Sequence, residues 1–468
     1  MATLPVADRD TREKSRFVYC QARPTLGNNT STLFPSWVPK TILKGIRLIK
    51  QLVVNTIERY ARYKIDKNLN LQYTDERKYP QPDPTKSYLL YLHIPFCKVF
   101  CPYCSFHKYS FDEKKAREYF ATLRKEIRIA KERGFRFSSV YIGGGTPTIL
   151  PDELASTIDL VRELFDIDEL SCEADPDISD ALIDLLKERV DRLSVGIQSL
   201  DDKRLEQTKR CNKFGTADEQ VENIKKLIAN FKIVNCDLIF NFPDQTAEEL
   251  REDIQKLKAL SPQQISMYPL MYSPSVRKEI ETNMGAVQNK KEYALYRVIL
   301  DELGSDYVQN SCWAFSKKGI TLIDEYVVDH VEYLGLGSGA FGFIDGTLYI
   351  NTFALDEYKQ RVDSNQFSTA RHKSYSPKEI LSYRLMVDMF GFGFSMENLA
   401  DRYGAHAKKK LAIELFLLKL FKITDKNYQL TTFGKYIFLI LMKEFYIGMD
   451  YVRETSREGI DRFGFLKK

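Results

Sequence analysis

Three cysteines with close, uneven spacing are the strongest chemical signal in this sequence. Cys97, Cys101 and Cys104 lie in the run YLHIPFCKVFCPYC, residues 91–104, with the spacing Cys-x3-Cys-x2-Cys. Three thiolates suit a [4Fe–4S] cluster, because the cube has four irons and one of them is then left without a protein ligand. An open iron can coordinate a small molecule, so the spacing predicts a reactive cluster rather than one that only carries electrons.

Two other interpretations of the cysteines stay open at this point. Three buried thiols can simply fill an apolar core. A zinc site normally needs four ligands in paired Cys-x2-4-Cys knuckles, and His107 could serve as the fourth ligand here. The chain has 8 cysteines, and their scatter does not indicate a disulfide framework, so we expect a reducing compartment.

The segment around the cysteines also resembles a known family. It is similar to radical S-adenosylmethionine (SAM) enzymes and, more narrowly, to the oxygen-independent coproporphyrinogen III oxidase-like family with its heme-chaperone and methyltransferase branches. The resemblance implies that the amine and carboxylate of SAM bind the open iron, and that an electron from the cluster cleaves SAM to a 5′-deoxyadenosyl radical that attacks the substrate. It also implies an electron donor such as flavodoxin or ferredoxin.

Strand and helix patterns alternate from about residue 85 onward. The expected strands are residues 88–94, 138–142, 169–174, 192–197, 233–240 and 264–270, with helices between them. Such alternation predicts a parallel sheet covered by helices, here an α/β fold built as a partial (β/α)6 barrel of the TIM type. Chemistry in these barrels lies at the carboxyl ends of the strands, and the cysteines directly follow the first expected strand.

Two further motifs follow the second and third expected strands. Residues 143–148 contain three glycines, which let a backbone approach a ligand, and their N–H groups suit a carboxylate or a ribose. The resemblance implies that Gly144, Gly145 and Thr146 contact the aminoacyl end of SAM. It also implies that Glu173 contacts SAM, whereas Asp175 is expected to cap the next helix.

The later strands carry candidates for a second ligand. By the resemblance, Gln198, Arg210 and Asp237 line a site for either another SAM or the substrate. Arginine suits this role because its planar fork of donors matches a carboxylate. Phe341 lies in a further motif of the family, where it stacks on the adenine or fills the core.

Three residues of the cysteine segment are expected to act beside the cluster. His93 is the candidate catalytic residue, with proton transfer and a positioned core histidine as equal alternatives. The resemblance implies that Tyr91 contacts SAM, and Tyr103 is expected to pack beside the cluster.

The sequence predicts three regions. Residues 1–84 form a loose tail and a basic amphipathic helix over 40–63, which either packs on the main domain or makes weak peripheral contact with a membrane. Residues 85–364 form the barrel domain.

Residues 365–468 form a mostly helical, winged-helix-like cover domain. It has a capping box at Ser376–Glu379, helices over 395–404, 407–421 and 432–446, and a hairpin over 423–430. Lys408, Lys409 and Lys410 could touch DNA phosphates, but a solvated face is favoured and no nucleic-acid partner is expected.

Composition narrows the class of protein. A hydrophobic content of 44%, a charged content of 28% and a net charge of +5 are ordinary for a globular chain of 468 residues. The sequence shows neither a signal peptide nor a run of about 18 apolar residues, so we expect a cytoplasmic protein without a transmembrane segment.

The resemblance leaves the reaction open. It implies oxidative decarboxylation of tetrapyrrole propionates in heme and porphyrin metabolism. The oxidases proper usually have another cysteine two residues after the third, and this chain has Phe106 there. A heme chaperone that binds heme without turnover and a methyltransferase that uses two SAM molecules are therefore alternatives, with one or two SAM molecules bound.

Overall fold

The computed structural model describes residues 40–73, 81–287, 289–320, 330, 332–397, 399–461 and 464. The chain forms two compact units, Met1–Asn55 and Thr56–Lys468, which are described separately. Helix α2 (Lys40–Asn68) begins in the first unit and ends five residues beyond the predicted 40–63. The expected loose tail at residues 1–36 lies outside the described residues.

The second unit is built around one long sheet. The six predicted strands are β2 (Tyr88–Ile94), β5 (Phe137–Gly144), β6 (Glu169–Ala174), β7 (Arg192–Gln198), β8 (Ile233–Phe240) and β9 (Gln264–Pro269). They are neighbours in this order and pair in parallel throughout. The predicted α/β fold, a partial barrel of six βα units, is therefore confirmed.

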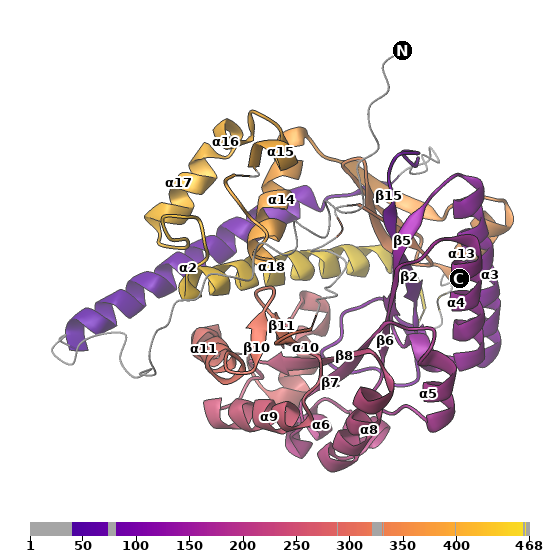
Figure 1. Ribbon diagram of the computed structural model, residues 1–468, viewed down its shortest axis with the longest axis horizontal. Helices are drawn as coiled ribbons and strands as arrows, with labels where there is room; N and C mark the ends of the chain where they lie inside the picture. Colours follow the sequence, from indigo (N-terminus) through magenta and orange to yellow (C-terminus); the bar gives the residue numbers. More distant parts are fainter. Residues whose placement is uncertain are drawn as a thin grey trace. The chain divides into compact units, whose positions relative to one another are not determined.

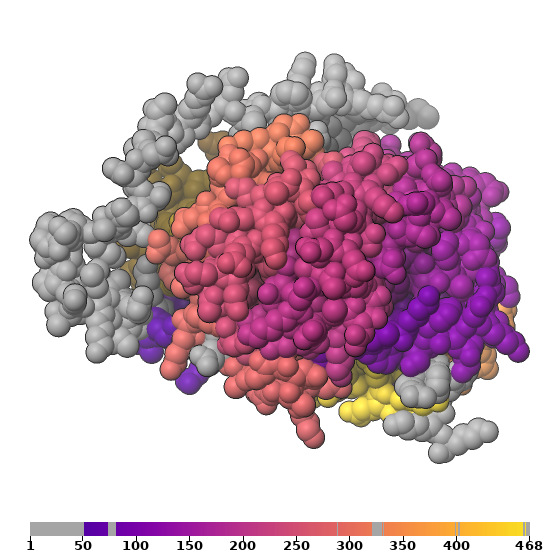
Figure 2. Space-filling model, turned by 90° about the horizontal axis from the view of Figure 1, so that it is seen from below, coloured from indigo at the N-terminus to yellow at the C-terminus, as the bar shows by residue number. Residues whose placement is uncertain are grey.

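Helices cover the outside of these strands (Figure 1). They are α3 (Glu113–Glu132), α4 (Pro151–Leu164), α5 (Asp180–Leu186), α6 (Asp202–Gln207), α7 (Cys211–Phe214), α8 (Ala217–Asn230) and α9 (Ala247–Leu260). Figure 2 shows one face on which the sequence colours run in order from purple to salmon, as expected for consecutive helices around a barrel. Strand β2 is buried at six of its seven positions because both faces of the sheet are covered.

Local signals set where these helices begin. Asp112 caps α3 by accepting from the N–H of Lys115, and complete capping boxes start α8 and α9. These signals are readable from sequence, because each lies within a few residues of the helix that it starts.

The sheet extends beyond the six predicted strands on both edges. Strand β12 (Tyr333–Leu336) pairs in parallel with β2, and β13 (Phe341–Ile344), β14 (Thr347–Asn351), β15 (Thr369–Ser374) and β1 (Gln72–Tyr73) continue the sheet. On the other edge β9 is followed by β11 (Ala314–Lys317) and β10 (Tyr307–Gln309). All but β15 of these strands have two to five residues, too few for a period-2 pattern to stand out.

The C-terminal region is helical, with several corrections to the predicted elements. Helix α14 (Pro377–Phe390) begins with the predicted capping box, but α15 (Leu399–Tyr403) is half the predicted length. The helix predicted over 407–421 is divided into α16 (Ala407–Lys410) and α17 (Ala412–Leu420). The predicted hairpin over 423–430 is present in a short form, with one antiparallel bridge from Thr424 to Leu430.

Helix α18 (Thr432–Ser456) is ten residues longer than the predicted 432–446. Lys443 and Glu444 break its apolar run in sequence, yet both are buried in ion pairs, with Glu292 and Arg62 respectively. Among the helices in the described part of the chain, none is long and apolar enough to cross a membrane.

Candidate functional site

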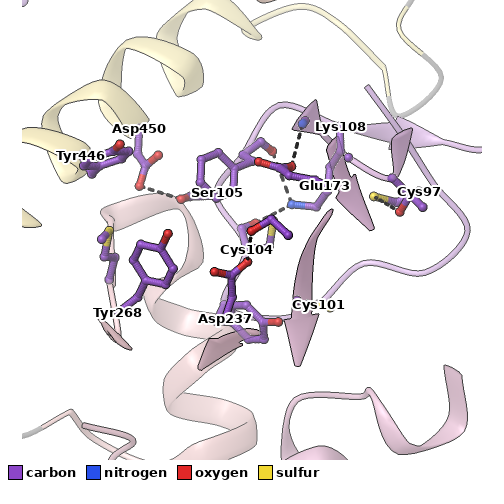
Figure 3. Close-up of a pocket in the computed structure, with 18 of the residues that line it drawn as sticks. Cys97, Cys101, Cys104, Ser105, Lys108, Glu173, Asp237, Tyr268, Tyr446 and Asp450 are labelled. Carbon is purple, nitrogen blue, oxygen red and sulfur yellow. Dashed lines mark hydrogen bonds between the residues drawn. The ribbon is translucent and has the colours of Figure 1, made fainter. Parts of the chain in front are cut away.

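One cavity of about 310 Å³ gathers every predicted site residue. Its floor is formed by the carboxyl ends of the barrel strands and by the loop that carries the cysteines. In Figure 3 this loop faces Tyr446 and Asp450 of helix α18. The predicted residues that line the cavity are Tyr91, His93, Cys97, Cys101, Tyr103, Cys104, Gly144, Gly145, Thr146, Glu173, Gln198, Arg210, Asp237 and Phe341.

The three cysteines are free thiols in a basic surrounding. Cys97 is buried, and its sulfur lies 3.6 Å from the hydroxyl of Thr146. Nη1 of Arg210 donates to Sγ of Cys101 across 3.7 Å, and Nζ of Lys108 donates to the carbonyl of Cys104 across 2.5 Å. Burial raises the pKa of Cys97 to about 12, so a bare thiolate at this position is unfavourable without a metal.

These residues fit a cluster held by three thiolates. Such a cluster is negatively charged overall, and the cationic groups of Arg210, Lys213 and Lys108 all line the same cavity. Within the described ranges no three His, Cys, Asp or Glu side chains converge as around a single ion. A cube does not require this convergence, because each thiolate binds a different iron.

The glycine turn packs against the cysteine segment. Gly144 adopts a φ of +127°, which favours glycine, and a Cβ on Gly145 would lie 2.6 Å from the carbonyl oxygen of Phe96. The N–H groups of Gly145 and Thr146 donate to the carbonyls of Ile94 and Phe96. The expectation that the N–H groups of the turn await a ligand is therefore wrong, because the protein itself uses them.

Glu173 completes this turn. Its carboxylate accepts from the hydroxyl of Tyr141 and from the N–H of Gly144, each across 3.0 Å. Burial raises the pKa of Glu173 to about 7, although both hydrogen bonds oppose the shift. Glu173 therefore lies at the cavity wall, poised to change charge near neutral pH.

The predicted role of Asp175 as a helix cap is wrong. Ser179 caps α5, because it lies directly before the helix and its hydroxyl accepts from the N–H of Leu182. Asp175 instead accepts from the hydroxyl of Thr146 across 3.3 Å and pairs with Lys213 across 3.2 Å. Asp175 thus belongs to the cavity.

Arg210 is a buried residue rather than a surface one. Only 4% of it is exposed, and its guanidinium donates to Cys101, to the hydroxyl of Tyr103 and to the carbonyl of Gly196. Its Nε is buried and has no partner among the described residues. Tyr103 therefore packs beside the cysteines as expected, with Arg210 between the cysteine loop and strand β7.

The remaining residues predicted for a second ligand lie at adjacent strand ends. Asp237 on β8 accepts from Ser194 across 2.9 Å and from Asn235 across 2.7 Å, and burial raises its pKa to about 6. Gln198 ends β7 with a left-handed φ of 74°. Both side chains reach the cavity that also holds Arg210.

His93 is held on both ring nitrogens. Its Nδ1 accepts from the hydroxyl of Tyr91 across 2.7 Å, and its Nε2 donates to the carbonyl of His107 across 3.1 Å. Burial lowers the pKa of His93 to about 4, which keeps the ring neutral. This geometry favours the positioned histidine of the two alternatives, because proton transfer requires one of these bonds to break.

A second wall of the cavity escaped the sequence analysis. Apart from Phe341, none of its residues was predicted. It is rich in aromatic and methionine side chains from β9 and the segment after it, the residue before β11, β12, β13, α14 and α18: Tyr268, Met271, Trp313, Tyr333, Phe341, Tyr383, Phe445, Tyr446 and Met449. Phe341 also packs in the core, which was one of its two expected roles, and stacking on the adenine stays a prediction. The positions 446, 449, 450 and 453 follow a helical spacing, but the helix had been predicted to end at 446.

Part of the chain matches a known protein family. Residues 91–257 match the model of the radical SAM superfamily. The chain therefore carries a radical SAM domain, and this family implies a [4Fe–4S] cluster and SAM as cofactors.

Curated relatives and a solved structure are similar to the chain over more of its length. The chain is 28% identical over 329 residues to the heme chaperone HemW of Bacillus subtilis, covering 67% of this chain and 86% of that protein. It is 25% identical over 414 residues to the oxygen-independent coproporphyrinogen III oxidase of Salmonella typhimurium, covering 80% and 88%. The solved structure of the coproporphyrinogen III oxidase HemN from Escherichia coli shares the fold, with a TM-score of 0.65 at 22% identity over 77% of this chain and 91% of that one. The chain thus carries a radical SAM domain and is similar beyond it to heme chaperones and to oxygen-independent coproporphyrinogen III oxidases.

Proposed function

We propose that this protein binds a tetrapyrrole beside a SAM-cleaving cluster and decarboxylates its propionate groups oxidatively. The main support for the proposal is that one cavity has three free thiols on one wall and a broad aromatic wall opposite. The pyrrole rings of a porphyrinogen, like the flat macrocycle of a porphyrin or heme, have aromatic faces that can stack on such a wall.

The residues of the chain divide into two groups in this proposal. Cys97, Cys101 and Cys104 would hold the cluster, which when bound supplies the electron for reductive cleavage of SAM. In this proposal the carboxylates of Glu173 and Asp175 would contact SAM, and the turn of Gly144 and Gly145 would shape the wall beside it.

The second group serves the substrate. Gln198, Arg210 and Asp237 are candidates for a second ligand, and the aromatic wall excludes water from the reacting carbon. Excluding water and other hydrogen donors matters because a primary carbon radical is otherwise quenched. A small reducing protein such as flavodoxin or ferredoxin is the proposed electron donor. The substrate radical would release one electron with each carbon dioxide, and the oxidised form of such a one-electron carrier would accept it.

The experiment is anaerobic reconstitution of the full chain with iron, sulfide and reductant, followed by addition of SAM and coproporphyrinogen III. The proposal expects 5′-deoxyadenosine and loss of carboxyl groups from the porphyrinogen, and neither in a Cys97→Ala variant. Absence of 5′-deoxyadenosine with every porphyrinogen tried would contradict it.

A heme chaperone is the second candidate, favoured by one position in the site. Phe106 replaces the further cysteine that the oxidases usually have, and its ring lies under the guanidinium of Arg453 at 5.0 Å. Two of the relatives are themselves named heme chaperones, at 28% and 29% identity.

This candidate expects stoichiometric heme binding without porphyrinogen turnover. Titration of the full chain with heme should then shift the Soret band with a one-to-one end point, and an unchanged band removes the candidate. S-adenosylhomocysteine among the products would instead support a methyltransferase that uses two SAM molecules.

A further inference from the structure

Arg453 on helix α18 reaches the cavity beside the cysteine loop. Its guanidinium lies 5.0 Å from the ring centre of Phe106 and 5.3 Å from that of Phe341, so two aromatic rings hold it in place. Its side chain is only 11% exposed. Stacking on ring faces leaves the edge of a guanidinium, where all its donors lie, free to bind an acceptor.

Most of these donors have no acceptor among the residues that the structure describes. Nη1 donates to one oxygen of Asp450, and this is the only hydrogen bond that the Arg453 side chain makes within the described residues. The other oxygen of Asp450 accepts from the hydroxyl of Ser105 across 2.6 Å (Figure 3). An arginine offers five N–H donors, so Arg453 keeps several of them for a ligand.

The other cations of the cavity are engaged more fully. Arg210 has three acceptors, Lys213 pairs with Asp175, and Lys108 donates to two carbonyls of the cysteine loop. Arg453 is therefore the cation of this cavity with the largest unused capacity in the described part of the chain.

The surroundings indicate what kind of anion reaches it. Tyr446 and Met449 share α18 with Arg453 and belong to the aromatic wall, so a ring stacked on that wall has its edge near the guanidinium. A carboxylate on a short side chain of a flat ring satisfies both features, because the ring meets the wall and the carboxylate meets the donor fork.

We propose that Arg453 is the receptor for a carboxylate of the ring-shaped substrate, with Asp450 holding the guanidinium in place until that carboxylate arrives. This inference rests on the proposed function, and it adds a specificity-determining subsite on α18. The subsite orients the substrate so that one edge lies beside the loop of Cys104, Ser105 and Phe106.

The test compares the binding of two porphyrins to the full chain. Mesoporphyrin IX has two propionate groups that ionise, whereas in its dimethyl ester both are esterified and carry no charge. Binding is followed by porphyrin absorbance and fluorescence. The wild-type chain should bind the free acid about 10- to 100-fold more tightly than the ester, in line with a charged hydrogen bond. Arg453→Gln should lose this preference with unchanged ester affinity, and Arg453→Lys should keep part of it.

Arg371→Gln is the matched control. Arg371 also stacks on an aromatic ring, 4.0 Å from that of Tyr73, but it does not line the cavity. This variant should keep the full preference for the acid. Thermal midpoints of all variants check that the fold persists.

Other outcomes are equally informative. Equal affinity of the wild type for acid and ester overturns the subsite but leaves the proposed function standing. Binding of neither porphyrin overturns both. A SAM carboxylate is the other possible anion, so loss of SAM affinity in Arg453→Gln with an unchanged preference for the acid also overturns the proposal.

Discussion

At the scale of single residues, burial sets the charges of the cavity. Glu173 and Asp237 have their pKa raised to about 7 and about 6, and burial is the largest cause in both. Their hydrogen-bond partners are too few to offset the loss of water. These two carboxylates therefore gain charge within the physiological range, and ligand binding should depend on pH.

The first prediction concerns Glu173. Because the raised pKa keeps the group protonated below about 7, SAM affinity of the reconstituted wild type should rise as the pH goes from 6 to 8. Glu173→Gln should lower the affinity at pH 8 about tenfold or more and flatten the pH profile. Equilibrium dialysis of SAM measures both effects. Glu169→Gln, at the other end of the same strand, is the control, and an identical pH profile in Glu173→Gln contradicts the prediction.

The second prediction concerns Gly145. A Cβ at this position meets the backbone of Phe96, directly before Cys97, and backbone cannot move aside cheaply. Gly145→Ala should therefore displace the cysteine loop and reduce the iron retained per chain after reconstitution. Gly134→Ala introduces a strained φ but no contact within 4 Å and should retain normal iron. Equal iron in the Gly145 variant would show that the turn does not position the loop.

At the scale of elements, α18 closes the site and a buried ion pair fastens it to the barrel. Nζ of Lys443 lies 2.9 and 3.0 Å from the two oxygens of Glu292, and both side chains are at most 1% exposed. Tyr436 and Asn241 donate to the same carboxylate. The pair thus joins α18 to α11 (Glu292–Leu303) and to the end of β8.

Removing one partner of this pair is the third prediction. Lys443→Met leaves Glu292 buried without its counter-charge and should destabilise the protein by about 3–5 kcal/mol. Lys443→Met combined with Glu292→Gln should recover much of the loss, since no uncompensated charge remains. Chemical denaturation measures both.

The control for this prediction is Glu444→Gln, which breaks the half-exposed pair with Arg62. Because Arg62 is 61% exposed, the loss should be smaller, about 1 kcal/mol from the ion pair itself. Equal losses from the two pairs would contradict the role given to burial.

At the scale of the whole molecule, the cavity joins the first barrel strand to the last helix. Ser105 and Asp450 are separated by 345 positions in sequence, yet their side chains are 2.6 Å apart. The loop that holds the cysteines is therefore bonded to α18, so a change in the order of the loop should also change the order of the helix.

The fourth prediction follows from this connection. Removing iron from the reconstituted protein with a chelator should loosen the cysteine loop and raise hydrogen exchange in the last two turns of α18. In Asp450→Asn the exchange of α18 should be high before chelation and change little afterwards. Mass spectrometry of exchanged peptides gives the result, and wild-type exchange that does not respond to iron removal would show that the two elements are independent.

The sequence by itself determined the elements and the chemistry of the floor. Periodicity, capping boxes and the spacing of Cys97, Cys101 and Cys104 are local properties, so they predicted the six parallel strands and placed the cysteines after the first. Because carboxyl ends of parallel strands meet at one edge, residues as distant as Tyr91 and Asp237 could be expected to share a site.

Only the tertiary structure decided the opposite wall and the state of the polar groups. The helical spacing of positions on α18 shows which side chains share a face, but only packing between distant segments decides that this face and the donors of Arg453 line the cavity. The same packing uses up the N–H groups of the glycine turn and buries Arg210, because hydrogen bonds and burial depend on what lies nearby in space rather than along the chain.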